Sequence, residues 1–248
     1  MLIAPQNSSA ARMLQENLRR LRQEISAAAA AADRSEQSVT LVAVSKGQSV
    51  SAVRAAAALG LEHFGESYLQ EAVAKREALA ELPITWHFIG RVQSNKTRPL
   101  AEQFDWVHGV DRLKIAERLS AQRPADRAPL NVCLQINIAA ETTKAGIAPE
   151  ESAELAAAVA RLPGLRLRGL MAILPAGLAV EERRRSFGSL QALLRQLNAR
   201  GAALDTLSMG MSDDFREAIL EGATLVRIGT ALFGPRPYSS EHAHTKTV

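Results

Sequence analysis

The sequence predicts a closed (β/α)8 barrel with an additional helix at its N-terminal side. From about residue 40 onward, short apolar runs alternate with helical patterns, which is typical of a parallel sheet. Eight such runs occur in a chain of 248 residues, which matches the strand number and size of a closed barrel. A doubly wound open sheet is the alternative, but no Gly-x-Gly-x-x-Gly turn follows the first run. We expect one barrel domain over residues 1–248, with loose termini at about 1–7 and 236–248.

The elements are expected in a regular order. A long helix is predicted up to about residue 32, because large apolar residues recur at spacings of three and four. These residues are Leu14, Leu18, Leu21 and Ile25, and the candidates for the helix N-cap are Asn7, Ser8 and Ser9. Strands are expected at 41–45, 62–65, 85–89, 105–108, 131–137, 167–171, 205–208 and 224–228. Helices are expected between most of them, at 49–59, 68–81, 95–103, 112–121, 150–161, 181–200 and 212–221.

Composition excludes several classes of function. The net charge of +4 is small, and no basic stripe with interleaved aromatic residues occurs, so we expect no nucleic-acid partner. The one cysteine, Cys133, lies in an apolar run and predicts a buried thiol in a reducing compartment. Neither a secretory signal nor a membrane-spanning stretch is present, so we expect a soluble cytoplasmic protein with no membrane partner. The five histidines lack metal-ligand spacing, and no metal is predicted.

The first strand delivers a lysine to its C-terminal tip. Leu41 to Ser45 read as a buried strand, and Lys46 follows immediately. Partial burial lowers the pKa of a lysine and makes its free amine a nucleophile. Such an amine can form a Schiff base with a carbonyl ligand such as pyridoxal phosphate. The alternative is that Lys46 simply extends from the strand end into water.

Polar residues concentrate at the C-terminal ends of the other strands, where a barrel places its functional groups. The ends after the seventh and eighth strands are suited to a phosphate. At these ends, Gly229 lets backbone N–H groups approach an anion, and Ser208 and Thr230 add hydroxyls. The alternative for Gly229 is a simple turn. Ser212 is predicted to be the N-cap of the helix expected at 212–221.

Two further residues within the predicted strands have polar side chains that need hydrogen-bond partners. Arg227 lies in an apolar strand, so its guanidinium needs an acceptor inside the barrel mouth. A pyridine nitrogen is one such acceptor, and an always-protonated arginine would keep that nitrogen unprotonated. A salt bridge to a barrel carboxylate is the alternative. His87 is predicted to support the barrel mouth through hydrogen bonds rather than to act as a base.

Several long motifs together resemble one known family. They are Ala43-Val44-Ser45-Lys46, Phe64-Gly65-Glu66, Trp86-His87-Phe88-Ile89-Gly90, Gln93-Ser94-Asn95-Lys96, Arg168-Gly169-Leu170-Met171, 207–214 and 226–234. In this order they resemble the pyridoxal phosphate homeostasis proteins, the YggS/PROSC family, over about residues 10–238. The family implies a barrel like the N-terminal domain of alanine racemase.

The resemblance also implies a cofactor site. It implies pyridoxal 5'-phosphate (PLP) as a Schiff base on Lys46 and Arg227 at the pyridine nitrogen. Phosphate contacts are implied from Ser208, Gly229 and Thr230. The remaining cofactor-binding residues that it implies are Ser67, Met209 and Lys144.

The chain departs from the family pattern around the rim of the site. Gly47-Gln48-Ser49 replaces a run that usually contains Thr or a basic residue and then Pro, and Arg91 stands where Pro is common. Ser67 replaces the usual Asn, so a hydroxyl stands in for a side-chain amide. These changes affect the pocket rim and cofactor transfer, and they leave Lys46 and Arg227 in place.

Three classes of function compete. They are a PLP holder that takes part in intracellular PLP homeostasis and delivery, a PLP-dependent amino-acid racemase or lyase, and a phosphosugar barrel enzyme with a lysine Schiff base. We expect the holder, a monomer with no catalytic residues and at most trace racemase activity, which delivers PLP to apo PLP-dependent enzymes. Racemases that the barrel resembles take a second base, a tyrosine, from a second domain, and the sequence to Val248 shows no such domain. Its tyrosines are Tyr68 and Tyr238.

Overall fold

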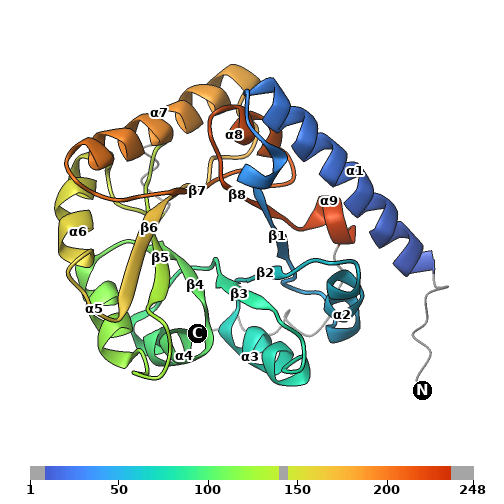
Figure 1. Cartoon of the computed structure of the whole chain (residues 1–248), viewed down its shortest axis with the longest axis horizontal. Helices are drawn as coiled ribbons and strands as arrows, with labels where there is room; N and C mark the ends of the chain where they lie inside the picture. Colours follow the sequence, from blue (N-terminus) through green and yellow to red (C-terminus); the bar gives the residue numbers. More distant parts are fainter. Residues whose placement is uncertain (1–8, 140–144, 236–248) are drawn as a thin grey trace, which may run out of the picture.

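Eight parallel strands close into a barrel in the computed structural model, which describes residues 9–139 and 145–235 (Figure 1). The strands are β1 Thr40–Val44, β2 His63–Glu66, β3 Thr85–Phe88, β4 Trp106–Val110, β5 Leu130–Gln135, β6 Leu165–Met171, β7 Thr206–Ser208 and β8 Leu225–Ile228. Each strand pairs with the next in the chain, and β8 pairs with β1 to complete the circle. The predicted barrel is therefore confirmed.

Helices surround the barrel on the outside (Figure 1). They are α1 Ser9–Ala31, α2 Val50–Ala58, α3 Leu69–Ala78, α4 Thr97–Gln103, α5 Leu113–Gln122, α6 Ser152–Val159, α7 Val180–Ala199, α8 Phe215–Leu220 and α9 Thr230–Phe233, with 3-10 turns η1 Glu36–Ser38, η2 Ser94–Lys96 and η3 Pro149–Glu151. Within the described residues, no helix is both long enough and apolar enough to cross a membrane.

The additional helix α1 packs along the outside of the barrel beside α8 and α9 (Figure 1). Its predicted apolar stripe is buried over its whole length, from Leu14 to Ile25. Asn17 adds a polar contact, because its side-chain amide donates to the carbonyl of Leu232 at 3.0 Å. The helix ends before Asp33, whose φ of 54° takes the chain out of the helical conformation.

Two expectations about the last part of the chain were wrong. The helix predicted at 212–221 begins only at Phe215, and Ser212 is not its N-cap. The Ser212 hydroxyl instead accepts a hydrogen bond from the backbone N–H of Ala231 in α9. The four-residue α9 was not predicted, because one helical turn leaves no periodic pattern in a sequence.

Most of the apolar core lies between the barrel and its helices. A smaller apolar cluster fills part of the barrel interior and consists of Val42, Trp106, Cys133, Met171 and Leu225. Cys133 is fully buried, as predicted. The rest of the interior is more polar than the branched aliphatic layers usual for such barrels.

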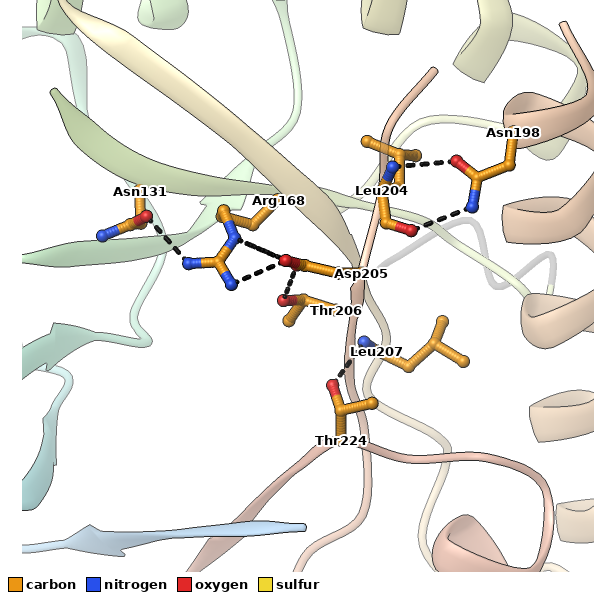
Figure 2. Close-up of polar contacts among 8 residues, drawn as sticks. All are labelled: Asn131, Arg168, Asn198, Leu204, Asp205, Thr206, Leu207 and Thr224. Carbon is orange, nitrogen blue, oxygen red and sulfur yellow. Dashed lines mark hydrogen bonds and ion pairs between the residues drawn. The ribbon is translucent and has the colours of Figure 1, made fainter. Parts of the chain in front are cut away.

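One polar cluster ties β5, β6 and β7 together near their N-terminal ends (Figure 2). Arg168 on β6 donates to both carboxylate oxygens of Asp205, at 2.9 and 2.8 Å, and to the side-chain oxygen of Asn131 on β5 at 3.1 Å. Its guanidinium also lies 4.7 Å from the ring centre of Trp106. These contacts join three neighbouring strands at the end of the barrel opposite Lys46.

Candidate functional site

Lys46 follows β1 at the C-terminal end of the barrel and is partly buried. Gly47 turns the chain away immediately afterwards with a φ of 71°, a conformation that glycine adopts without strain. The backbone N–H of Gly47 donates to a carboxylate oxygen of Glu71 at 2.6 Å. The departure from the family pattern at Gly47 therefore holds a turn that fixes where Lys46 leaves the strand.

A buried charged cluster supports the strand ends beside Lys46, and sequence reasoning missed it. The amine of Lys75 donates to Glu66 at 2.7 Å, to Glu71 at 2.6 Å and to the carbonyl of Ser45 at 2.5 Å. The Ser45 hydroxyl donates to the same Glu66 oxygen at 2.6 Å. The other Glu66 oxygen, Oε2, is buried without a hydrogen-bond partner among the described residues.

Two opposing effects act on the pKa of Glu66 in this cluster. Burial raises the pKa of Glu66, and the nearby amine of Lys75 opposes that rise. The signal that could have found the pair is local, since Glu71 and Lys75 are four residues apart on one helix face. The contact to Glu66 depends on how α3 packs on β2, which no sequence pattern contains.

Arg227 lies on β8 and is almost completely buried, with 4% of its surface exposed. Its Nη1 donates to the Ser208 hydroxyl at 2.8 Å, and its Nη2 donates to the carbonyl of Ala172 at 2.9 Å. Both acceptors are neutral, and no salt bridge to Arg227 occurs within 9–139 and 145–235. Burial lowers the pKa of Arg227 to about 10, with the carboxylate of Asp214 acting in the opposite direction.

The end of β7 carries two predicted site residues, the last strand residue Ser208 and the following Met209, and their side chains have different surroundings. The Ser208 side chain is fully buried, and its hydroxyl contacts both Arg227 and His108 Nδ1, the latter at 2.7 Å. Met209 is also fully buried, but its side chain packs into the core outside the barrel, and its N–H donates to the carbonyl of Leu225. The carbonyl of Met209 is therefore the polar group that it has left to offer a ligand.

Gly210 closes this loop with a φ of 93°. A side-chain carbon at this position would lie 2.7 Å from Ala218 Cβ and 2.9 Å from Phe215 Cα, so only glycine fits. The carbonyl of Gly210 accepts the backbone N–H of Arg227 at 2.9 Å. The loop thereby holds the strand that carries Arg227.

The loop after β8 lies next to the strand that carries Lys46. Gly229 follows β8, and a carbon added to it would lie 3.3 Å from the carbonyl oxygen of Val44, at the end of β1. Thr230 is the first residue of α9 and is exposed. The bond from Ala231 N–H to Ser212 fastens this loop to the one after β7. The two loops proposed from sequence for a phosphate therefore lie side by side.

The remaining predicted site residues lie at the rim or beyond the described chain. Ser67 follows β2 and is partly buried. Its carbonyl oxygen would lie 2.4 Å from a side-chain carbon at Gly90, so the loops after β2 and β3 touch. Lys144 lies outside the described residues.

His87 makes the hydrogen bonds predicted for it. Its ring nitrogens lie 2.9 Å from His63 Nδ1 and 2.9 Å from His108 Nε2. Its ring also stacks on Trp106, with centres 5.4 Å apart. Among the described residues, no group of three histidine, cysteine, aspartate or glutamate side chains is arranged to hold a metal ion.

The site contains groups that fit an aldehyde-bearing pyridine phosphate. It has an amine just after β1, a buried guanidinium on β8 that has no carboxylate partner within the described part of the chain, and two joined loops with a glycine and a hydroxyl. A model of the alanine racemase N-terminal domain family matches residues 14–237. The chain belongs to this family.

Individual relatives show which members of this family the chain is similar to. The chain is 57% identical to a pyridoxal phosphate homeostasis protein of Pseudomonas aeruginosa, over 91% of this chain and 96% of that protein. It is 52% identical to the protein of the same name from Escherichia coli, over 91% of this chain and 97% of that protein. A solved structure of PipY from Synechococcus elongatus with PLP bound superposes with a TM-score of 0.79, at 38% identity, over 89% of this chain and all of that one. The resemblance found in the sequence motifs is confirmed.

Proposed function

We propose that the protein holds PLP as a Schiff base on Lys46 and takes part in PLP homeostasis. The observation that carries the proposal is Arg227, a buried cation without a carboxylate partner among the described residues. It lies on β8, the neighbour of the strand that leads to Lys46. A buried charge of this kind needs an acceptor, and a bound ligand is the natural source of one. The 57% identity to a homeostasis protein supports the same assignment.

The groups of PLP correspond to the groups of the site. PLP, when bound, supplies an aldehyde that an amine can attack, and Lys46 is the amine at the mouth. Arg227 donates to the pyridine nitrogen. The phosphate is held by Gly229 and Thr230 together with the loop of Ser208 and Met209. Ser67 lies at the rim, and Lys144 is proposed near the cofactor from the family resemblance alone.

We further propose that the protein holds and releases the cofactor without turning over amino acids efficiently. A guanidinium at the pyridine nitrogen keeps that nitrogen unprotonated, which weakens the electron sink that such chemistry needs. Racemisation also needs a second base opposite Lys46. Tyr68 is 60% exposed and its hydroxyl has no hydrogen bond within the described residues, so none of these residues holds it over the site. Apo PLP-dependent enzymes are the recipients that we propose.

Trapping the Schiff base tests the central assignment. Purified protein incubated with PLP and reduced with borohydride should carry the label on the peptide that contains Lys46. Lys46→Ala should abolish that label, while Lys96→Ala, a control at another loop on the same end of the barrel, should keep it. A label found mainly on Lys96 or Lys144 in the unmodified protein would contradict the assignment. L-Amino acids incubated with the loaded protein should show at most trace racemisation by chiral chromatography, and turnover above about 1 per second that depends on Lys46 would favour the racemase.

The phosphate contacts have a separate test. A hydrogen bond to a charged oxygen contributes roughly 1.5–3 kcal/mol, so Thr230→Ala should weaken PLP binding about ten- to a hundredfold. Pyridoxal, which lacks the phosphate, should bind equally weakly to the unmodified protein and to the variant. If PLP and pyridoxal bind the unmodified protein with equal affinity, the phosphate is not held by these loops.

A further inference from the structure

Three histidines form a continuous hydrogen-bonded chain through the inside of the barrel, which we name the histidine chain. His63 Nδ1 lies 2.9 Å from His87 Nε2, and His87 Nδ1 lies 2.9 Å from His108 Nε2. His108 Nδ1 lies 2.7 Å from the Ser208 hydroxyl, which accepts from Arg227 Nη1 at 2.8 Å. The histidine chain therefore ends on the residue that holds Arg227.

The stagger of the strands gives the histidine chain its direction. His87 pairs with Gly65, which lies two residues beyond His63 on β2. His108 lies two residues beyond Trp106, which pairs with His87. Each step thus moves toward the C-terminal end of the barrel, as the shear of a closed barrel requires. The histidine chain connects the N-terminal end of the barrel with the end at which we place the cofactor.

Burial favours the neutral form of the inner two histidines. Burial, followed by the positive charge of Arg227, lowers the pKa of His108 to about 3. Burial and the two neighbouring rings lower the pKa of His87 well below its usual value. A neutral imidazole has one N–H donor and one acceptor nitrogen. Each inner ring therefore donates a hydrogen bond to one neighbour in the histidine chain and accepts one from the other neighbour.

Only two proton arrangements satisfy every bond in the chain. If all three rings carry hydrogen on Nε2, then the Ser208 hydroxyl donates to His108 Nδ1, and its hydrogen is used. If all three carry hydrogen on Nδ1, then Ser208 accepts from both His108 and Arg227, and its own hydrogen is free to be donated elsewhere. A mixed arrangement would place two donors or two acceptors against each other, which leaves a buried group unsatisfied.

We propose that the histidine chain positions Ser208 and Arg227 for the cofactor and transmits the protonation state of His63 to the Ser208 hydroxyl. The inference rests on the proposed function for its ligand. In both arrangements the Ser208 hydroxyl accepts from the Arg227 guanidinium. The histidine chain therefore orients the guanidinium that we place at the pyridine nitrogen. Only the Nδ1–H arrangement also leaves Ser208 with a hydrogen to donate to an acceptor on PLP.

In this proposal, a proton enters the histidine chain at its outer residue, His63. His63 is partly buried and lines a pocket of about 300 Å³ at the N-terminal end of the barrel. Its Nε2 has no hydrogen-bond partner among the described residues. Burial lowers the pKa of His63, and the carboxylates of Glu62 and Asp105 oppose that effect. The other charged groups that line the pocket are Arg22 from α1 and Glu36 from η1.

Protonation of His63 selects one arrangement. A charged imidazole donates from both nitrogens, so His63 Nδ1 must then donate to His87 Nε2. That bond requires the hydrogen of each ring in the histidine chain to lie on Nδ1. The Ser208 hydroxyl then keeps its own hydrogen for another acceptor. Affinity for PLP should therefore rise as His63 becomes protonated. Because coupling between binding equilibria is reciprocal, bound PLP should make His63 easier to protonate.

Ring-nitrogen NMR of the cofactor-free protein tests the chain without PLP. We expect His87 and His108 to show the same tautomer and to change their signals with the titration midpoint of His63 while they stay neutral. His63→Gln, which cannot take up a proton, and His63→Phe should abolish that change. Glu36→Gln, a control in the same pocket but outside the chain, should keep it. Opposite tautomers at His87 and His108, or signals that ignore His63, would overturn the proposal.

Absorbance titrations with PLP at several pH values test the link to the cofactor. One neutral hydrogen bond corresponds to about a two- to tenfold change in affinity, so affinity should rise by that factor as the pH falls through the His63 titration. The rise should be absent in His63→Phe and present in Glu36→Gln. An identical pH dependence in His63→Phe would overturn the proposal. Absence of borohydride-trapped label on Lys46 in the unmodified protein would overturn the proposed function instead, and the NMR experiment would still decide whether the chain transmits protonation.

Discussion

Two arginines on strands β6 and β8 of the barrel have opposite surroundings. Arg168 on β6 has a carboxylate partner, because Asp205 accepts two of its N–H groups and Asn131 a third (Figure 2). Its side chain keeps 23% of its surface exposed, and that of Asp205 keeps 53%. This arginine is satisfied by the protein and by water.

Arg227 on β8 is more buried and less well paired. Its hydrogen bonds end on a hydroxyl and a carbonyl, and its nearest carboxylate influence, Asp214, makes no ion pair with it. A buried guanidinium that lacks a carboxylate partner lowers the stability of the cofactor-free protein. Arg168 therefore has a carboxylate partner within the fold, whereas Arg227 has none among the described residues, and we propose that a ligand supplies its acceptor.

The largest expected effect on PLP binding comes from replacing Arg227. Arg227→Met should weaken PLP binding about ten- to a hundredfold, because the hydrogen bond to the pyridine nitrogen and the orientation of Ser208 are lost. The cofactor-free variant should unfold within about 1 kcal/mol of the unmodified protein, because the cost of burying an unpaired charge disappears as well. Absorbance titration and urea unfolding measure the two quantities. A large loss of stability with normal PLP binding would make Arg227 structural.

The second effect concerns Arg168, whose replacement should lower the stability of the fold and leave PLP labelling of Lys46 unchanged. Arg168→Met removes a bidentate ion pair and a cation–π contact to Trp106, and should lower the free energy of unfolding by about 1–2 kcal/mol. PLP should still label Lys46 to the same extent, because the cluster lies at the opposite end of the barrel. Urea unfolding and borohydride trapping on the same sample measure both. Loss of label in a folded variant would show that the two ends are coupled.

The smallest expected effect is a loss of stability in acid. Burial alone would raise the pKa of Asp205, but hydrogen bonds from Arg168 and Thr206 lower it below its usual value. A lowered pKa in the folded state means that this stability is present above about pH 4 and is lost as the pH falls through the folded value. The amount should be less than about 1 kcal/mol for a half-exposed pair.

Unfolding experiments between about pH 5 and 2 measure this acid effect. Asp205→Asn should remove that part of the pH dependence, while Glu36→Gln, which lies away from the pair, should leave it unchanged. A variant with the same acid response as the unmodified protein would show that Asp205 does not contribute to it.

Local patterns predicted much of the fold. The apolar stripe of α1 and the eight alternating strands were found because burial repeats with the period of each element. The position of Lys46 at the end of β1 followed from the same alternation. The later start of α8 was not found, because the Ser212 hydroxyl contacts the backbone N–H of Ala231 in α9 instead of capping α8. The four-residue α9 was not found, because one helical turn leaves no periodic pattern in a sequence.

The sequence by itself determined that the chain forms a parallel barrel, which family it belongs to, and that Lys46 and Arg227 are found at its strand ends. Its motifs carry that information because they are contiguous and their spacing follows the strands. The tertiary structure alone decided that His63, His87 and His108 join Ser208 inside the barrel, and that Lys75 meets Glu66 beside Ser45. Those contacts depend on the stagger between strands and on helix packing, and residues as far apart as His108 and Ser208 meet only when the barrel closes.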